Sequence, residues 1–529
     1  SLPICQLGHF FFVFTNSMSE IVDKHVLKRY DIHSKVGKGA YGIVFKAKDR
    51  KTGKTVAVKK VYDAFLNITD AQRTFREIMI LQQLKHDNII PLIDIMKADN
   101  DRDFYIVFPF VSTDLHAVVR TNILENIHKK YILYQLLLAL AYIHSGELLH
   151  RDLKPSNILI NSDCIVRLCD FGLARSLACD SSSSKPESAA LLTDYVATRW
   201  YRAPEILLGV SAYTSGIDMW SLGCLFGELL TGKPLFPGSS TLNQLTRIIN
   251  MTGHPSEEDL KEIGSPFART MLDAIPTTAP KSTPFVQWAK TGILPSIASD
   301  PALNKRFSYC TPSPMTVRRL ALLIPSACPE TIDILARLLS FSPSHRLQAE
   351  DALHHPFVAV FSRGEGTAST PSISLPVAPY PLLLRPISLP LSDGVKYSVE
   401  EYRQKVYECI RKRKRRKERH GLSRSGSSFS SGSRSSLSSS STASLRSSHS
   451  SSRSTHSRST LSHSSSSSSS SVSSSSSAHS SSRSGHRGSS RKGARECRED
   501  KERRKAQKER ERSFHGERSR DRFLRDNAF

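Results

Sequence analysis

The sequence predicts an α+β domain that is followed by a disordered tail. Residues 30–47 and 56–59 have the pattern of strands, and residues 73–81 carry apolar side chains at helical spacing. Beyond about residue 410, serine and arginine dominate and few side chains can be buried. We therefore expect the 529 residues to form one sizeable folded domain rather than several.

Charge and cysteine content describe different parts of the chain. The net charge of +25 comes largely from the C-terminal region, so the basic character is a property of the tail and not of the domain. The nine cysteines are scattered, odd in number and without Cys-x-x-Cys spacing. This pattern favours reduced thiols in a cytoplasmic or nuclear protein and predicts no disulfide framework.

Residues 1–29 form an N-terminal extension. The apolar run Phe10–Phe14 is too short to span a bilayer and has no basic region before it. Because Met18 opens a polar segment that leads into the domain, we interpret residues 1–17 as upstream sequence, with a short hydrophobic anchor as the alternative. No transmembrane segment is predicted.

The first two strands flank a glycine-rich hairpin, Gly37-Lys38-Gly39-Ala40-Tyr41-Gly42-Ile43-Val44. Its backbone can lie close over phosphates, although such a run alone is equally an ordinary turn. The next strand, Val56-Ala57-Val58-Lys59, follows at the expected spacing. A lysine on a buried strand needs anionic partners, and phosphate groups together with a helix carboxylate can provide them.

Glu77 is the predicted carboxylate partner of Lys59. It lies in the helix at residues 73–81, where Phe75, Ile78 and Leu81 or Leu84 mark one face. The alternative is an ordinary surface glutamate.

The densest motif is His150-Arg151-Asp152-Leu153-Lys154-Pro155-Ser156-Asn157, which Asp170-Phe171-Gly172 follows. A hydroxyl that attacks the γ-phosphate of ATP needs a carboxylate beside it, metal ligands and a lysine to spread the phosphate charge. The segment supplies all three in order. It predicts a phosphoryl-transfer site, against the alternative of a solvated turn.

The order of glycine loop, lysine, helix glutamate and catalytic loop resembles the eukaryotic protein kinases from Tyr30 to about Val358. The resemblance implies a bilobal fold, with a small β-rich N-lobe at 30–108, a hinge at 109–111 and a larger helical C-lobe at 112–358. It implies that Asp152 accepts the proton of the substrate hydroxyl, that Lys154 steadies the γ-phosphate, and that Asn157 and Asp170 hold Mg²⁺. Lys154 also fits the serine/threonine-specific pattern.

The cofactor is therefore expected to be ATP with Mg²⁺. The strand Phe104–Phe108 leads into the hinge, whose backbone would bind adenine, and Asp114 is either a ribose acceptor or a helix N-cap. The residues expected to contact ATP are Val36, Gly37, Gly39, Gly42, Val44, Ala57, Lys59, Pro109, Phe110, Val111, Asp114 and Asn157.

The segment from Thr193 to Glu205 resembles the activation lip of the mitogen-activated protein kinases, with Thr193 and Tyr195 as phosphorylation sites. Arginines should receive the phosphates; the candidates are Arg73, Arg76, Arg151 and Arg175 for Thr193, with Arg199 and Arg202 for Tyr195. The resemblance also implies that Glu205 pairs with Arg346 and that Asp218 braces the catalytic loop. Through Arg199 it implies protein substrates with Ser/Thr-Pro sites, because proline leaves no buried amide donor unpaired.

Two further motifs, Pro255–Leu260 and Lys396–Tyr407, are most similar to the atypical mitogen-activated protein kinase 15 type. That similarity implies autophosphorylation of the lip. Ser398 and Glu401 have the spacing of a capping box, and Val399, Tyr402, Val406 and Ile410 share one helical face. We expect this amphipathic helix, within a C-terminal extension at 359–410, to dock on the kinase domain.

Residues 281–316 are interpreted as an insertion in the large lobe, and residues 411–529 as a basic, Ser/Arg-rich disordered tail. The basic run at 411–417 could be a nuclear-import signal, could contact RNA, the cytoskeleton or an acidic membrane, or could simply be solvated. The alternative function is a catalytically weak kinase-fold scaffold whose tail recruits RNA-processing or cytoskeletal partners. We expect a monomer. No proline follows Pro390, so a proline-directed kinase should find poor sites in its own tail.

Overall fold

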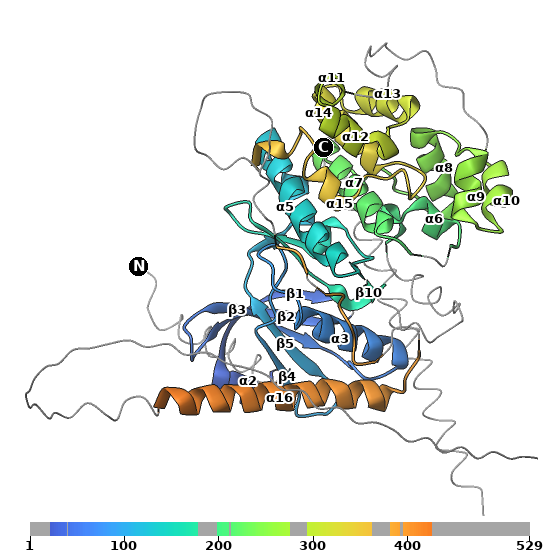
Figure 1. The fold of residues 1–529 in the computed structure, drawn as a ribbon. Helices are drawn as coiled ribbons and strands as arrows, with labels where there is room; N and C mark the ends of the chain where they lie inside the picture. Colours follow the sequence, from blue (N-terminus) through green and yellow to red (C-terminus); the bar gives the residue numbers. More distant parts are fainter. Residues whose placement is uncertain are drawn as a thin grey trace, which may run out of the picture. The chain divides into compact units, whose positions relative to one another are not determined.

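The computed structural model describes residues 22–39, 41–177, 198–210, 213–275, 294–361, 381–383, 385–391 and 395–425. Thr193 and Tyr195 therefore lie outside the described residues, as do residues 1–17, the first part of the expected insertion and residues 426–529. Figure 1 shows the two lobes of the domain, with one long helix along the smaller lobe.

The N-lobe is built on a five-stranded antiparallel sheet in the order β1-β2-β3-β5-β4. This sheet confirms the predicted hairpin and the strands that follow it. The elements of the lobe are α2 (Lys24–Arg29), β1 (Tyr30–Gly39), β2 (Gly42–Asp49), β3 (Thr55–Val61), α3 (Ile68–Leu81), β4 (Asp94–Lys97) and β5 (Phe104–Pro109).

The two faces of this sheet are covered by different helices. Side chains of β2 and β3 such as Phe45 and Val58 pack with Val26 of α2, and all three are fully buried. On the other face, Phe104 and Ile106 of β5 pack with Phe75 of α3. The side-chain alternation along β3 therefore determines which helix each of its residues faces.

Helix α3 begins at an N-cap, Asn67, whose side chain accepts a hydrogen bond from the Asp70 backbone N–H at 2.9 Å. Every residue from Phe75 to Leu81 is buried. Helix α3 therefore packs against the sheet on one side and against other parts of the chain elsewhere. It buries more residues than its predicted apolar face alone.

The C-lobe is mainly helical, with two small sheets of order β10-β7 and β6-β8-β9 close to the N-lobe. Its strands are β6 (Thr113–Asp114), β7 (Leu148–Leu149), β8 (Ile158–Ile160), β9 (Val166–Leu168) and β10 (Arg175–Ser176). Its helices are α4 (Leu115–Thr121), α5 (Asn126–Ser145), α6 (Pro204–Leu207), α7 (Gly216–Thr231), α8 (Thr241–Thr252), α9 (Glu257–Ile263), α10 (Ala268–Asp273), α11 (Pro295–Ala298), α12 (Pro301–Arg306), α13 (Pro314–Leu323), α14 (Pro329–Leu338) and α15 (Ala349–Ala352).

Buried ion pairs connect the helices of the C-lobe. Arg346 donates to both carboxylate oxygens of Glu205, at 2.7 and 3.0 Å, as the family resemblance implied. Asp333 accepts from Arg337 at 2.6 Å and contacts Nε2 of His355 at 2.8 Å, and none of these three side chains is more than 1% exposed. Each buried charge therefore has a partner, which the cost of burying it requires.

The expected insertion at 281–316 is more integral than the sequence indicated. From residue 294 onward it forms α11, α12 and the start of α13, and Leu294, Ile297 and Cys310 are buried in the main core. Arg337 donates to the carbonyl oxygens of Phe307 and Cys310. Residues 294–316 are therefore part of the core of the C-lobe. Their apolar side chains are buried there, and two of their carbonyl oxygens accept hydrogen bonds from Arg337.

Residues 381–391 connect the two lobes. The Ile387 backbone N–H donates to the Gly146 carbonyl oxygen at 2.8 Å, and Ser176 Oγ donates to the Ile387 carbonyl oxygen at 2.5 Å. Further along, the Gln83 side chain at the end of α3 donates to the Ser388 carbonyl oxygen at 3.0 Å. The segment thus leads the chain from the C-lobe to the N-lobe.

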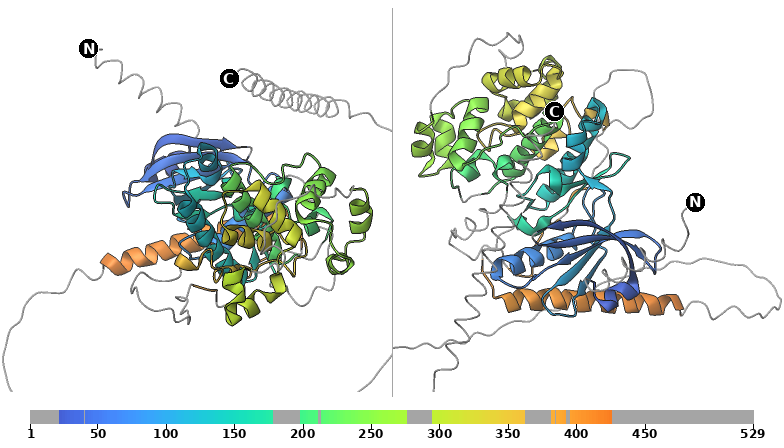
Figure 2. Two further views of the ribbon diagram at one scale, coloured as in Figure 1. Left: turned by 90° about the horizontal axis from the view of Figure 1, so that it is seen from above. Right: turned by 180° about the vertical axis from the view of Figure 1, so that it is seen from behind.

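Helix α16 (Val399–Ser425) then lies along the N-lobe beside α3 and β4, as Figures 1 and 2 both show. The predicted capping box is present: Ser398 Oγ accepts from the Glu401 backbone N–H, and the Glu401 carboxylate accepts from the Ser398 backbone N–H at 2.8 Å. Tyr402 and Val406 are buried, and the Tyr402 ring lies 5.3 Å from that of Phe75. Docking of this helix on the kinase domain is confirmed.

The expected boundary of the tail at residue 411 is wrong, because α16 continues through the basic run to Ser425. Lysine and arginine are good helix formers. Lys412 pairs with Glu408 one turn earlier at 2.7 Å, and Arg413 donates to the carbonyl oxygens of Leu92 and Ile93. Within the described residues, no helix is long and apolar enough to cross a membrane.

Candidate active site

Lys59 and Glu77 form an ion pair, as the sequence predicts. Lys59 Nζ lies 2.9 and 3.0 Å from the two carboxylate oxygens of Glu77. Burial lowers the pKa of Lys59, but the negative charges of Glu77 and Asp170 outweigh it, so the pKa is raised. Burial raises the pKa of Glu77, the negative charge of Asp170 raises it further, and the cation of Lys59 only partly offsets these effects. Lys59 is therefore a fixed cation.

The glycine loop is held close to β3 at Gly42. A Cβ atom at this position would lie 2.1 Å from the Lys60 carbonyl oxygen, so only glycine fits. At Gly37 and Gly39 no described atom beyond the chain neighbours lies within 4 Å of such a Cβ, which leaves room on that side of the hairpin. Val44 is paired with Lys59 in the register of β2 and β3, and Ala57 lies two residues before Lys59 on the same strand face.

The catalytic loop draws three predicted residues together. Lys154 Nζ lies 2.7 Å from Asp152 Oδ2, and Asn157 Nδ2 donates to the same oxygen at 3.0 Å and to the Asp152 carbonyl oxygen at 2.8 Å. These contacts fix the Asp152 carboxylate in one orientation. These contacts also use the side-chain nitrogen of Asn157, Nδ2, and leave its side-chain oxygen, Oδ1, for another partner.

Asp218, which lies in α7, holds the catalytic loop in place, as the family resemblance implied. Its carboxylate accepts the backbone N–H groups of His150 and Arg151, both at 2.8 Å, and contacts His144 Nε2 at 3.0 Å. Burial raises the pKa of Asp218, but the hydrogen bonds and positive charge around it outweigh burial, and the pKa is lowered. Arg151 has a positive φ of 66°, so the loop needs this anchor to hold a costly backbone conformation.

Asp170 lies at the start of its motif with φ 65° and ψ 72°, and accepts from the Gly172 backbone N–H at 3.4 Å. Phe171 is fully buried, with its ring 4.9 Å from that of His150. Burial raises the pKa of the Asp170 carboxyl, but Lys59, His150 and Lys154 lower it further than that, so the group is held ionised.

One cavity of about 180 Å³ is lined by Lys59, Glu77, Asp152, Lys154 and Asp170. Residues from the β3 strand, α3, the catalytic loop and the Asp170 motif thus meet at one place, although 75 to 111 positions separate Lys59 and Glu77 from Asp152 and Asp170. Their meeting is what a phosphoryl-transfer site requires.

The residues expected to contact adenine and ribose lie between the end of β5 and the start of α4. Pro109 ends β5, and the Phe110 N–H donates to the Thr55 carbonyl oxygen at 3.4 Å. The Val111 N–H makes no hydrogen bond to any described residue, which leaves it for a ligand. Asp114 is the N-cap of α4, where its Oδ1 accepts from the Ala117 N–H at 2.9 Å. One of its oxygens is therefore already engaged.

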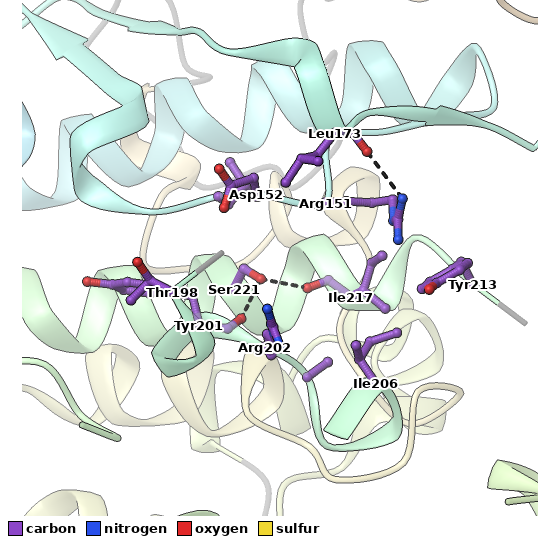
Figure 3. A pocket seen from close by; sticks show the side chains of 12 residues that line it. Arg151, Asp152, Leu173, Thr198, Tyr201, Arg202, Ile206, Tyr213, Ile217 and Ser221 are labelled. Atoms are coloured by element: carbon purple, nitrogen blue, oxygen red, sulfur yellow. Dashed lines mark hydrogen bonds between the residues drawn. The ribbon is translucent and has the colours of Figure 1, made fainter. Parts of the chain in front are cut away.

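A second cavity lies on the other side of Asp152, and Figure 3 shows its lining. It has a volume of about 40 Å³ and lies between the catalytic loop and the segment that follows the lip, from Thr198 to Ala203. Ser221 donates to the Tyr201 carbonyl oxygen, and the Tyr201 hydroxyl donates to Glu228 at 2.6 Å. The two cavities share two lining residues, Asp152 and Leu173.

Sequence reasoning named Arg151 but missed Tyr213 and Ser221, which also line this second cavity. The guanidinium of Arg151 lies 4.3 Å from the ring centroid of Tyr213 and also donates to the Leu173 carbonyl oxygen. Ser221 and Tyr201 fix the backbone after the lip. No local pattern marks Tyr213 or Ser221, because each acts through a contact with a distant part of the chain.

The donor set fits a magnesium ion. Asp170 offers a carboxylate that its neighbours keep charged, and Asn157 offers the amide oxygen that its own hydrogen bonds leave free. Mg²⁺ prefers such hard oxygen ligands. These two residues would hold the ion beside the phosphates.

Comparison with known proteins agrees with this geometry. Residues 30–358 match the protein kinase domain family. The chain is 50% identical over 398 residues to extracellular signal-regulated kinase 2 of Dictyostelium discoideum, an alignment that covers 75% of this chain and 94% of that protein.

Two further relatives are named mitogen-activated protein kinase 15. The protein of Xenopus laevis is 46% identical over 78% of this chain and 62% of its own length, and that of Caenorhabditis elegans is 43% identical over 75% and 74%. The chain therefore belongs to the protein kinase family and, within it, to the serine/threonine-specific mitogen-activated protein kinases, where it is similar to mitogen-activated protein kinase 15.

Proposed function

We propose that this kinase transfers the γ-phosphate of ATP to serine or threonine followed by proline, with Asp152 as the catalytic base. The position of Asp152 carries the proposal. It lines both the cavity that holds Lys59, Glu77 and Asp170 and the cavity that opens toward the segment after the lip. A carboxylate at the boundary between a nucleotide and a protein substrate can accept the proton of the attacking hydroxyl.

The other residues of the first cavity stabilise negative charge. Lys59 would pair with the α- and β-phosphates and Lys154 with the γ-phosphate, since both are ammonium groups held in place by carboxylates. Bound Mg²⁺, held by Asn157 and Asp170, would neutralise phosphate charge. The glycine loop, from Val36 to Val44, would cover the phosphates.

We assign regulation to phosphorylation of Thr193 and Tyr195. Each phosphate adds about −1.5 to −2 charge, and arginines near the lip would receive it. Arg151 and Arg202 both line the second cavity, beside Thr198, where the chain leaves the lip. Their placement supports ordering of the lip by charge-assisted pairs.

The preference for proline is assigned to the segment that includes Arg199. Its guanidinium donates to the Ser239 carbonyl oxygen at 2.9 Å, and the Trp200 indole N–H donates to the Gly238 carbonyl oxygen at 3.2 Å. These bonds fix the short 3₁₀ turn Arg199–Tyr201 against the C-lobe. A rigid pocket that offers no acceptor would favour proline over residues with an amide hydrogen.

We also assign the lip modification to the enzyme itself, in line with the type that the chain resembles. The test uses full-length chain made without other kinases, incubated with ATP and Mg²⁺, and followed by mapping of phosphate. A Ser-Pro peptide is compared with the matched Ser-Ala peptide. Phosphate at Thr193 and Tyr195, with faster transfer to the Ser-Pro peptide, is the expected result.

Two results would overturn parts of the proposal separately. Equal rates on the two peptides would remove the assigned proline preference but leave the kinase reaction. Activity that appears only after an upstream kinase has been added would remove self-activation. A scaffold function would follow if neither treatment produced phosphate transfer.

A further inference from the structure

A second, strongly basic groove lies on the N-lobe, away from the active site. It has a volume of about 550 Å³ and is formed between α3, Pro390 and α16. Five of the side chains that line it are cationic, namely Lys405, Lys412, Arg413, Arg415 and Arg416, and one, Glu408, is acidic. Pockets for ligands have volumes in this range, so the groove is large enough for a specific partner.

The cations of the groove differ in how far they are already engaged. Arg413 holds the helix to the N-lobe through the carbonyl oxygens of Leu92 and Ile93. Lys405 and Lys412 flank Glu408, at 3.8 and 2.7 Å, and neutralise its charge. Arg415 and Arg416 are exposed and make no ion pair with a described residue. A net excess of positive charge therefore remains for an anionic ligand.

The floor of the groove connects this site to the catalytic lysine. Met79 and Gln82 belong to the last turn of α3 and its C-cap, and Glu77 lies in the turn before them. Gln82 also accepts a hydrogen bond from the Cys409 thiol of α16. A ligand in the groove would contact both helices at once and strengthen their contact.

We propose that this groove binds phosphoserine, and that its occupant is the chain's own serine-rich segment, residues 426–490, once another kinase has phosphorylated it. This inference goes beyond the proposed reaction: binding in the groove does not depend on it, and only the need for another kinase rests on the proposed proline preference. Phosphate groups form strong charge-assisted hydrogen bonds with arginine and lysine, which supply five of the ten residues that line the groove.

The composition of the segment supports its role as a switchable ligand. Between residues 426 and 490 there are six arginines, no lysine and no acidic residue, so the unmodified segment is repelled by the groove. Four phosphates would add about −6 to −8 charge and reverse its sign. The segment has no proline, so the kinase's own Ser/Thr-Pro preference does not serve it and a different kinase must supply the phosphate.

The connection along the chain is short enough for this contact. Residue 426 follows Arg416 by ten positions, nine of which continue α16. Twenty residues can reach at most about 65–70 Å, so the chain after Ser425 is long enough to return along the roughly 14 Å of helix that follow Arg416. A tethered ligand of this kind has an effective concentration in the millimolar range.

The test measures binding of a fluorescent peptide of residues 444–460 to full-length chain made without other kinases, in the absence of ATP. One peptide carries phosphoserine at Ser448, Ser450, Ser452 and Ser454, and its control has no phosphate. Arg415→Gln with Arg416→Gln removes two groove cations, whereas Arg411→Gln with Lys414→Gln removes two exposed cations of the same basic run that do not line it. Thermal unfolding verifies that both variants fold.

We expect the phosphorylated peptide to bind at least about tenfold more tightly than its control, and the groove variant to lose about tenfold or more in affinity. The variant outside the groove should change affinity by less than about threefold, since it alters only the long-range field. Full-length chain whose tail has first been phosphorylated by an arginine-serine-directed kinase should not bind the added peptide, because its groove is already occupied.

Three results would overturn the proposal. Equal binding of the two peptides would exclude phosphoserine recognition. Equal losses in the two variants would show attraction to a basic helix with no built site. Groove-dependent binding of tripolyphosphate or of an RNA oligonucleotide, without binding of the phosphopeptide, would replace the tail by a free anion or a nucleic acid as occupant.

Discussion

Lys59 is the residue whose surroundings the sequence predicts most fully. An ammonium group on a buried strand is costly without anions, and this cost alone predicts a helix carboxylate beside it. The structure supplies Glu77 at 2.9 Å and adds Asp170 as a second source of negative charge. The second carboxylate follows from the folded arrangement of distant segments and not from the strand.

Substitution Lys59→Met should lower kcat/KM for ATP by about 10²–10³-fold, because it removes a fixed cation at the position of the phosphates. Lys60→Met is the matched control, since Lys60 pairs with Asp103 on the opposite face of the strand. It should leave kcat/KM within about threefold of the unmodified chain. Steady-state kinetics with varied ATP measures both. Equal losses in the two variants would mean that strand stability, and not the Lys59 charge, determines activity.

Asp218 illustrates a residue that works through the backbone of others. Asp218→Asn keeps the shape of the side chain. It replaces the negatively charged carboxylate, which accepts the N–H groups of His150 and Arg151, with a neutral amide. We expect the free energy of unfolding to fall by about 1.5–3 kcal/mol, with a reduced kcat. Urea denaturation and kinetics on the same preparation test this. An unchanged kcat would show that the positive φ of Arg151 does not depend on this anchor.

At the scale of elements, α16 shows both the strength and the limit of sequence reasoning. Ser398, Glu401, Tyr402 and Val406 predicted the cap and the buried face correctly, because those signals repeat at helical spacing. The helix end was wrong by 15 residues, since a dense basic run resembles a solvated tail. Its stability comes from Glu408 and from carbonyl groups of the N-lobe, which the local sequence does not reveal.

Tyr402→Ala should lower the free energy of unfolding by about 3–5 kcal/mol, because it removes a fully buried ring that packs on Phe75 of α3. Arg411→Ala, on the exposed side of the same helix, should change it by no more than about 0.5 kcal/mol. Urea denaturation of the full-length chain compares the two. If both variants were equally stable, α16 would not be docked on the N-lobe in solution.

The buried cluster of Asp333, Arg337 and His355 links α14 to the turn after α15 and should make stability depend on pH. Burial lowers the pKa of His355 in the folded chain, despite its contact with Asp333. The unfolded chain therefore binds the proton more readily, and stability falls as the pH falls below the unfolded value of about 6.5. One such group contributes a slope of at most about 1.4 kcal/mol per pH unit.

Comparison of His355→Gln with the unmodified chain isolates this contribution. Denaturant unfolding between about pH 5.5 and 7 should show a shallower loss of stability in the variant. A slope unchanged by the substitution would assign the pH dependence to other groups, such as His86, whose pKa burial also lowers.

At the scale of the whole molecule, the sequence patterns predicted the α+β domain, and the resemblance to the eukaryotic protein kinases implied its bilobal organisation and the residues that meet between the lobes. These follow from motifs with strict chemical demands, such as Asp152 and Lys154 in one loop. It did not predict how residues 381–391 connect the two lobes, or that the segment from Leu294 to Cys310 is core. Ile387 and Ser388 bond to residues 211 and 305 positions away, and the carbonyl oxygens of Phe307 and Cys310 accept from Arg337, 30 and 27 positions later. Local patterns carry little information about such contacts.

The central claim is that this chain is a working kinase whose reaction depends on Asp152. The most direct measurement is ATP-dependent phosphate transfer to a Ser-Pro peptide by purified full-length chain, beside Asp152→Asn at equal concentration and equal thermal stability. We predict transfer that the substitution lowers by about 10²-fold or more, with ATP binding retained, because the base is lost while the phosphate contacts remain. Equal transfer by the two chains, or none by either even after an upstream kinase has been added, would contradict the claim.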